Sequence, residues 1–225
     1  MMQRGKQCPH GLRLLVTAFA VLAASVSPSR AQTAPARDDI VNALKNFDSA
    51  PDLDIAAIRQ KVLDKSRSRS RKEPEPNQRP PVVPEILNLP TFTVSIDFDS
   101  DTPVVRPSSY ETVGRIADAL VQANLLPYSF LIVGHTSSDG KREANVMLSQ
   151  RRADAIRDSL VNTFKISSKR VQSLGLGEEQ FVDQAHPASP ANLQIQIVTI
   201  AKLPEQSEQP AAAAPTTAKK KAKKR

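Results

Sequence analysis

Residues 130–160 read F-L-I-V-G-H-T-S-S-D-G-K-R-E-A-N-V-M-L-S-Q-R-R-A-D-A-I-R-D-S-L, and this stretch decides the fold. The apolar run from Phe130 to Val133 is typical of a buried strand. A polar segment at 135–140 follows it, and an amphipathic helix is expected to begin near Asn145. Ligands of open α/β sheets bind outside the carboxyl ends of the strands. The order of strand, polar loop and helix therefore predicts a binding site at this loop, with its ligand still open.

The flanking sequence predicts a small sheet with helices. Apolar and polar residues alternate over 92–98, as in a half-buried strand. The next helix is expected from about Ser108, which stands at capping-box spacing from Glu111. Two more strands are expected at 171–174 and 193–200. The resulting order β-α-β-α-β-β predicts a two-layer α/β sandwich of the α+β type.

Two motifs in the deciding stretch resemble those of the OmpA C-terminal domain family, which binds peptidoglycan. The first, G-H-T-x-x-x-G, spans 134–140, and the second, N-x-x-L-S-x-x-R-A, spans 145–153. The resemblance covers roughly residues 92–200, about half of the chain. It implies a small mixed sheet covered by helices. The matching residues are Gly134, His135, Thr136, Gly140, Asn145, Leu148, Ser149, Arg152 and Ala153.

A peptidoglycan stem peptide carries free carboxylates and an amine, so its binding calls for a cation and often an acid. The resemblance implies that Arg152 binds a carboxylate of diaminopimelate, since guanidinium donates two parallel hydrogen bonds to such a group. The family's acid follows G-H-T, and Ser137 stands in that place. Loss of one charge-assisted hydrogen bond costs ~1.5–3 kcal/mol, so we expect weak binding.

Several assignments at this loop stay open on the sequence alone. Asp139 either replaces the missing acid or forms the turn before Gly140. Asn145 either binds the ligand or caps the helix. His135 is expected to be a structural loop residue. The predicted peptidoglycan-binding set is Arg152, Asn145, His135, Thr136, Ser137, Asp139 and Leu148.

A second departure from the family pattern lies near the end of the matched region. Family members usually read N-R-R-V-E-I, whereas residues 192–197 read N-L-Q-I-Q-I. Leu193 and Gln194 thus replace two arginines, although the apolar alternation of a strand survives. This change supports an alternative function, in which the fold has lost peptidoglycan binding and serves as a protein-interaction or envelope-assembly module.

The first 31 residues are typical of a secretory signal peptide. Basic residues precede the apolar run Leu14–Val26, and small residues favour cleavage after Ala31. An uncleaved anchor is the alternative. The only cysteine, Cys8, precedes the apolar run, so we expect no lipidation. The predicted location is the periplasm of a Gram-negative bacterium, in association with the outer membrane or the cell wall.

Outside the predicted domain at 91–202, the chain is expected to carry less regular segments. Residues 32–64 form a short leader with helices at about 38–45 and 53–63, each marginal by itself. An Arg- and Pro-rich linker covers 65–90. The Ala-, Pro- and Lys-rich tail at 203–225 is expected to be disordered.

Charge and motifs limit the function further. The net charge of +8 falls to +4 without the four basic residues of 1–31, and to −2 without the six basic residues of 219–225. Because the basicity lies in a tail, we expect no nucleic acid partner. The tail is instead expected to contact anionic lipid or lipopolysaccharide, and an envelope protein is a further possible partner. No enzyme, metal or cofactor motif is present, which predicts a non-enzymatic protein.

Overall fold

The computed structural model describes residues 34–49, 52–68, 74–75 and 78–203. All of them lie in one compact unit. The predicted signal peptide, residues 69–73 and 76–77 of the predicted linker, and the tail beyond residue 203 lie outside the described residues. Among the helices of the described ranges, none combines the length and the apolar character that crossing a membrane requires.

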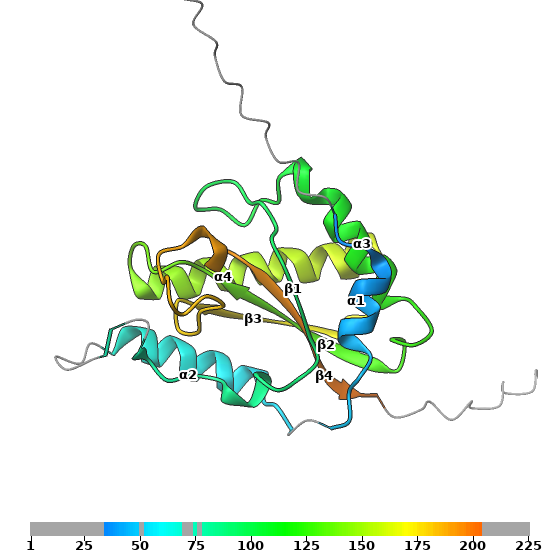
Figure 1. Cartoon of the computed structure of the whole chain (residues 1–225), viewed down its shortest axis with the longest axis horizontal. Coiled ribbons are helices and arrows are strands. Elements are labelled where there is room, and N and C mark those ends of the chain that lie inside the picture. Colours follow the sequence, from blue (N-terminus) through cyan, green and yellow to red (C-terminus); the bar gives the residue numbers. More distant parts are fainter. Residues whose placement is uncertain (1–33, 50–51, 69–73, 76–77, 204–225) are drawn as a thin grey trace, which may run out of the picture. The chain divides into compact units, whose positions relative to one another are not determined.

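Four strands form one mixed sheet in the order β1-β4-β2-β3 (Figure 1). The central strand β2 pairs in parallel with β3 and antiparallel with β4, and β4 pairs antiparallel with β1. The predicted fold class, a small mixed sheet with helices, is confirmed. The strands are β1 Thr91–Val94, β2 Tyr128–His135, β3 Val171–Gly177 and β4 Ile195–Lys202.

Two helices connect the first three strands in the predicted order. Helix α3 spans Tyr110–Leu120, and α4 spans Arg142–Asp158 before a π-helical turn at Ser159–Thr163. The predicted capping box is wrong, because Ser108 lies in the 3₁₀ turn Pro107–Ser109 ahead of α3. Its hydroxyl donates to Asp97 Oδ2 at 3.0 Å instead of to the helix backbone.

One face of the sheet is covered by α3, α4 and the N-terminal helix α1, Arg37–Leu44. The hydroxyl of Thr199 in β4 donates to the carbonyl of Leu44 at 2.9 Å, which satisfies a carbonyl at the end of α1. Apolar side chains of all these elements meet in one buried cluster, which includes Ile40, Ile116, Leu120, Phe130, Ile132 and Ile156.

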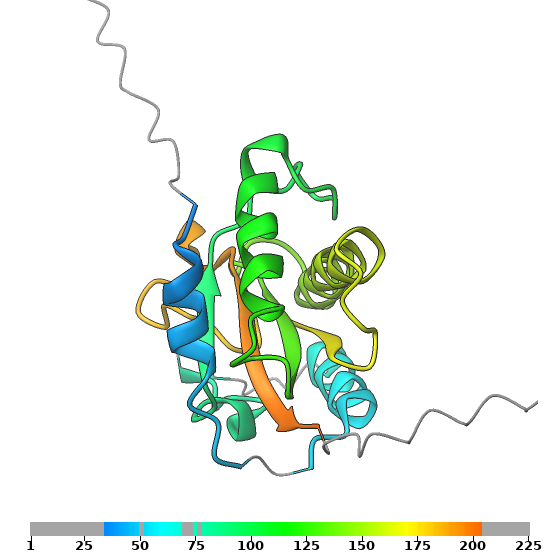
Figure 2. The ribbon, with the colours of Figure 1, turned by 90° about the vertical axis from the view of Figure 1, so that its right-hand side faces the viewer.

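The opposite face of the sheet is covered by helix α2, Ile55–Arg67, and by the 3₁₀ turn η2, Pro84–Ile86. Figures 1 and 2 show α1 and α2 on different sides of β4. The leader and linker boundaries drawn from the sequence stay predictions, but the described parts of both segments contribute to the core. The buried residues are Val62, Val82, Val83 and Ile86, which pack with Leu131, Val133, Leu174 and Val198.

Helix α4 lies unusually close to β2 and β3. A Cβ atom on Gly134 would lie 2.3 Å from the carbonyl oxygen of Ser149, and one on Gly175 would lie 2.2 Å from the backbone nitrogen of Gln150. Real Cβ atoms do not approach backbone atoms so closely. Glycine at these two positions therefore sets the distance between the helix and the sheet.

Side chains, rather than another strand, bind the outer edge of β3. An edge strand otherwise presents unpaired N–H and C=O groups. Helix α4 and helix α2 supply the partners for four of these groups. The bonds are Arg157 Nε to Val171 O (3.1 Å), Arg59 Nη2 to Ser173 O (2.8 Å), Gly175 N to Gln150 Oε1 (2.7 Å) and Gly177 N to Ser149 Oγ (2.8 Å).

Candidate functional site

The side-chain amide of Asn145 organises the loop between β2 and α4. Its Nδ2 lies 3.2 Å from the carbonyl oxygen of Ser137, 2.9 Å from that of Asp139 and 2.7 Å from Glu178 Oε2. The helix cap is Lys141, four residues earlier, so Asn145 does not cap α4. Asn145 is buried. It holds the loop from inside, with both loop carbonyls turned towards it.

The loop brings a carboxylate next to the serine that replaces the family's acid. The hydroxyl of Ser137 donates to Asp139 Oδ2 at 3.0 Å. Ser137 is buried, whereas Asp139 is exposed. Gly140 follows with a φ of 93°, so the predicted Asp-Gly turn is present as well. The two alternatives for Asp139 therefore coexist: the residue forms the turn, and its carboxylate lies beside Ser137.

Arg152 lies on α4 with its guanidinium largely removed from water. Its Nε donates to the carbonyl of Thr102 at 3.1 Å, and the guanidinium carbon lies 4.9 Å from the ring centroid of Phe98. Burial lowers the pKa of Arg152, an effect that the charge of Asp101 partly opposes. Among the described residues, Arg152 forms no ion pair within 4.0 Å. A buried cation without a paired carboxylate is suited to bind an anionic ligand group.

Arg170 is a second buried arginine, and its hydrogen bonds differ from those of Arg152. It is as buried as Arg152, at 9% exposure, and burial lowers its pKa in the same direction. Its guanidinium, however, donates to three carbonyls, those of Leu120, Leu125 and Tyr128, at 2.8–3.0 Å. These carbonyls lie where α3 ends and β2 begins, so Arg170 ties two elements together. Arg151, by contrast, is exposed on α4.

His135 lies buried at the end of β2, with both ring nitrogens in contact with the protein. Its Nδ1 lies 2.8 Å from the carbonyl oxygen of Gln180, and its Nε2 lies 3.0 Å from Gln196 Oε1. Burial lowers the pKa of His135, which favours the neutral ring. The next residue, Thr136, has a buried hydroxyl with no hydrogen-bond partner in the described part of the chain. Leu148 is half-buried on α4.

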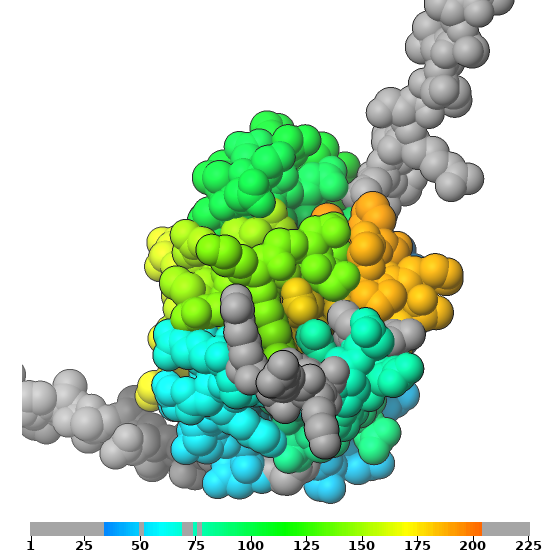
Figure 3. Space-filling model, turned by 90° about the vertical axis from the view of Figure 1, so that its left-hand side faces the viewer, coloured from blue at the N-terminus to red at the C-terminus, as the bar shows by residue number. Residues whose placement is uncertain are grey.

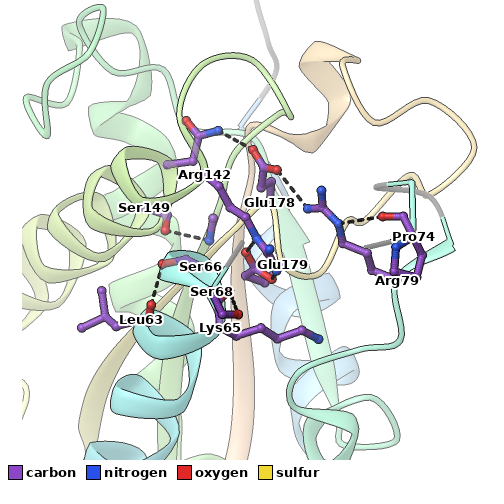
Figure 4. A network of polar contacts seen from close by, with 12 residues as sticks. Leu63, Lys65, Ser66, Ser68, Pro74, Arg79, Arg142, Ser149, Glu178 and Glu179 are labelled. Carbon is purple, nitrogen blue, oxygen red and sulfur yellow. Dashed lines mark hydrogen bonds and ion pairs between the residues drawn. The ribbon is translucent and has the colours of Figure 1, made fainter. Parts of the chain in front are cut away.

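Sequence reasoning missed the acidic residues that follow β3. Glu178 and Glu179 are both buried, at 5% and 2% exposure. Glu178 Oε1 accepts a hydrogen bond from Arg79 Nη1 at 3.0 Å, and Glu179 forms an ion pair with Arg142 in the first turn of α4 (Figure 4). The sequence G-L-G-E-E held the signal that could have revealed them. It places two acids directly after a strand, at the sheet edge where the loop lies.

The loop after Glu179 is held by Asn192. Its side chain accepts from the backbone N–H of Asp183 at 2.8 Å and donates to the carbonyls of Asp183 and His186. Leu193, which replaces the first family arginine, exposes 39% of its surface. Among the described residues, no group of three or more potential ligands is arranged to hold a metal ion.

Fold and site together define a small α/β domain with a buried arginine on helix α4. Residues 97–193 match the family model described as OmpA family, and the chain carries an OmpA family domain in this region. The predicted recognition is confirmed.

Curated relatives share this region. Outer membrane porin F of Pseudomonas aeruginosa is 35% identical over 100 residues, which cover 44% of this chain and 27% of the relative. The peptidoglycan-associated lipoprotein of Mesorhizobium japonicum is 36% identical over 93 residues, 40% of this chain and 54% of the relative. The chain thus spans about half the length of the lipoprotein and about a quarter of the porin.

Among solved structures, the peptidoglycan-associated lipoprotein from Burkholderia pseudomallei is 28% identical to this chain with a TM-score of 0.38. That match covers 48% of this chain and 88% of the solved one. The OmpA-like domain of FopA1 from Francisella tularensis is 19% identical, with a TM-score of 0.42 over 50% of this chain and 74% of that chain.

Proposed function

We propose that this protein is a non-enzymatic cell-envelope protein whose OmpA family domain binds peptidoglycan non-covalently. The observation that carries the proposal is the buried guanidinium of Arg152, which has no ion-pair partner in the described ranges. A stem-peptide carboxylate fits this cation. The name of a relative, peptidoglycan-associated lipoprotein, supports the same ligand. The proposed location is the periplasm of a Gram-negative bacterium, at the outer membrane or the cell wall.

Asp139 supplies the second half of the proposed site. The amine of a stem peptide needs an acceptor, and the Asp139 carboxylate lies beside Ser137, where the resembled family carries its acid. Because Asp139 is exposed, water weakens the attraction between this carboxylate and an ammonium group. The proposed site therefore binds the carboxylate strongly and the amine weakly.

Replacement of Arg152 by alanine is expected to weaken binding about ten- to a hundredfold, because it removes charge-assisted hydrogen bonds to the ligand. The measurement is the affinity of the full chain for isolated sacculi and for a soluble stem peptide containing diaminopimelate, at low and moderate salt. The control is Arg151→Ala, which removes an exposed positive charge from the same helix. Equal losses in both variants, or binding that moderate salt abolishes, would contradict the proposed site.

Replacement of Asp139 by asparagine is expected to weaken stem-peptide binding about threefold to tenfold, the effect of one exposed charged acceptor. The loss should disappear when the free amine of the stem peptide is acetylated, since the acceptor then has no cation to bind. The matched control is Asp118→Asn, which neutralises an exposed carboxylate on α3. Equal affinity of the D139N variant and the wild type would show that Asp139 serves only the turn.

A second candidate function is a protein-interaction or envelope-assembly module. Two exposed apolar residues favour it. Val182, 40% exposed, lies in the loop after β3, and Leu193, 39% exposed, lies at the end of that loop. Under this alternative, the wild type does not bind sacculi even at low salt, and the Arg152→Ala variant behaves like the wild type.

Contact of the basic tail at 219–225 with anionic lipid or lipopolysaccharide is proposed from its charge alone.

A further inference from the structure

We infer that Arg79 is a positioning residue for the ligand loop and acts through Glu178 and Asn145. The inference rests on the proposed function. Arg79 lies outside residues 97–193, the region that matches the OmpA family model. It is 99 residues from its partner in the sequence. Under this inference, the segment before the family domain supports the loop of the proposed site rather than serving as a passive connection.

A continuous series of contacts leads from Arg79 to the loop. Arg79 Nη1 donates to Glu178 Oε1 at 3.0 Å, and the side chains of the two residues are only 12% and 6% exposed (Figure 4). The other carboxylate oxygen of Glu178 accepts from Asn145 Nδ2 at 2.7 Å. Asn145 in turn donates to the carbonyls of Ser137 and Asp139. The series thus runs from Arg79 through the buried side chains of Glu178 and Asn145 to the backbone of the loop.

The charge of Arg79 is what allows Glu178 to keep this geometry. A buried carboxylate that loses its cation keeps its desolvation penalty and gains solvation only by turning outward. If Glu178 turns outward, Asn145 loses its shortest acceptor, and the two loop carbonyls lose a fixed donor. The loop that carries Ser137 and Asp139 then becomes less ordered, and the ligand must order it on binding.

The position of Arg79 is fixed by apolar packing. Val82 and Val83 follow it closely in the chain and are buried, at 2% and 1% exposure, under the sheet. Figure 3 shows the face on which α2 and residues 78–90 adjoin the start of α4. The guanidinium is therefore presented to Glu178 by a packed segment.

The same face offers a matched control. Arg67, in the last turn of α2, forms an ion pair with Glu143 in the first turn of α4 at 2.7 Å. Both side chains are about half exposed, and neither Arg67 nor Glu143 contacts Asn145 among the described hydrogen bonds. Arg67→Gln breaks this pair and removes one positive charge from the same region, as Arg79→Gln does, without touching the series of contacts that ends at the loop.

The experiment compares Arg79→Gln with Arg67→Gln in the full chain. Three quantities are measured: the affinity for a diaminopimelate-containing stem peptide, the NMR resonances of the Asn145 side-chain amide, and the thermal midpoint. Arg79→Gln is expected to weaken binding about tenfold, the effect of one hydrogen bond to a charged group, and to shift the Asn145 resonances. Arg67→Gln is expected to change the affinity less than about twofold, as exposed ion pairs contribute little.

The double variant Arg79→Gln with Glu178→Gln separates positioning from general stability. A neutral glutamine still accepts from Asn145 and needs no counter-charge, so the double variant is expected to bind more tightly than Arg79→Gln alone and to regain wild-type Asn145 resonances. Should Arg79→Gln fail to fold, Glu178→Gln is compared with the double variant: because the neutral amide needs no cation, adding Arg79→Gln to it is expected to leave both the affinity and the Asn145 resonances unchanged.

Unchanged Asn145 resonances and unchanged affinity in Arg79→Gln would overturn the inference, as would a loss that Glu178→Gln does not restore. These outcomes differ from failure of the proposed function. In that case neither the wild type nor any variant binds the stem peptide, while the Asn145 resonances of the Arg79 variants still report whether Arg79 positions the loop.

Discussion

Replacement of Gly175 by alanine is expected to destabilise the protein by about 3 kcal/mol or more, at the upper end of the cost of overpacking a core. The added Cβ would lie 2.2 Å from the backbone nitrogen of Gln150, 2.5 Å from its Cα and 2.7 Å from Ser149 Oγ. Two of these atoms belong to the backbone of α4, so no side-chain rotation relieves the contact. The helix must move away from β3, which breaks the hydrogen bond from Gly175 N to Gln150 Oε1. Denaturant unfolding followed by circular dichroism measures this loss.

The control for this prediction is Gly114→Ala in α3. A Cβ atom there would meet only the ring edge of Phe164 at 4.0 Å, an ordinary contact. Since alanine is the better helix former by about 1 kcal/mol, this variant is expected to be as stable as the wild type or slightly more stable. If Gly175→Ala and Gly114→Ala have the same small effect, α4 does not lie as close to β3 as described.

Replacement of Val62 by aspartate is expected to destabilise the protein by about 4 kcal/mol or more, because it buries a charge without a partner. Val62 lies on α2, is fully buried, and packs in the apolar cluster on the second face of the sheet with Leu131 and Val198. The expected result is a lower thermal midpoint with a single cooperative transition, since α2 then unfolds together with the sheet.

The matched control is Lys61→Asp, one residue earlier on the same helix. Lys61 is exposed, so this variant introduces the same side chain into water and is expected to change stability by about 0.5 kcal/mol or less. If Val62→Asp is also tolerated, or if α2 melts separately from the strands, the leader helix does not share the core of the domain.

The strands and helices of the family domain could be predicted because their apolar patterns are local. Their ends could not, because tertiary contacts decide them. The predicted strand at 92–98 leaves the sheet after Val94, and the backbone N–H of Asp97 donates to the Ser109 hydroxyl. The predicted strand at 171–174 continues to Gly177, where the glycines allow α4 to approach.

The packing of α2 lay beyond the reach of the sequence for the same reason. Its short apolar stripe fits a helix that packs on the domain, binds a partner or stays frayed. Val62 shares its apolar cluster with Leu131 and Val198, which lie about 70 or more residues further along the chain, so no local pattern reveals the contact. Only the folded arrangement shows that the first of these alternatives holds.

Some residues of the candidate site could be predicted from the sequence, and others could not. Arg152 and Asn145 could be found because both belong to an ordered motif. The position of the Asp139 carboxylate beside Ser137 depends on the turn at Gly140, so the sequence left two alternatives open. Arg79 gave no signal, since it stands among other arginines and prolines, and its partner Glu178 follows a strand far along the chain. All of these site assignments stay predictions until binding is measured.

The bonded outer edge of β3 has a consequence for how this protein associates with itself. A strand from a second copy cannot extend the sheet there without first displacing the side chains that already hold Val171, Ser173, Gly175 and Gly177. Strand-by-strand growth, the route by which open edges start aggregates, is blocked on this side. One of the four blocking groups, Arg59, belongs to α2. Detachment of α2 would uncover both the Ser173 carbonyl and the apolar face beneath, and would turn a closed edge into a template for aggregation.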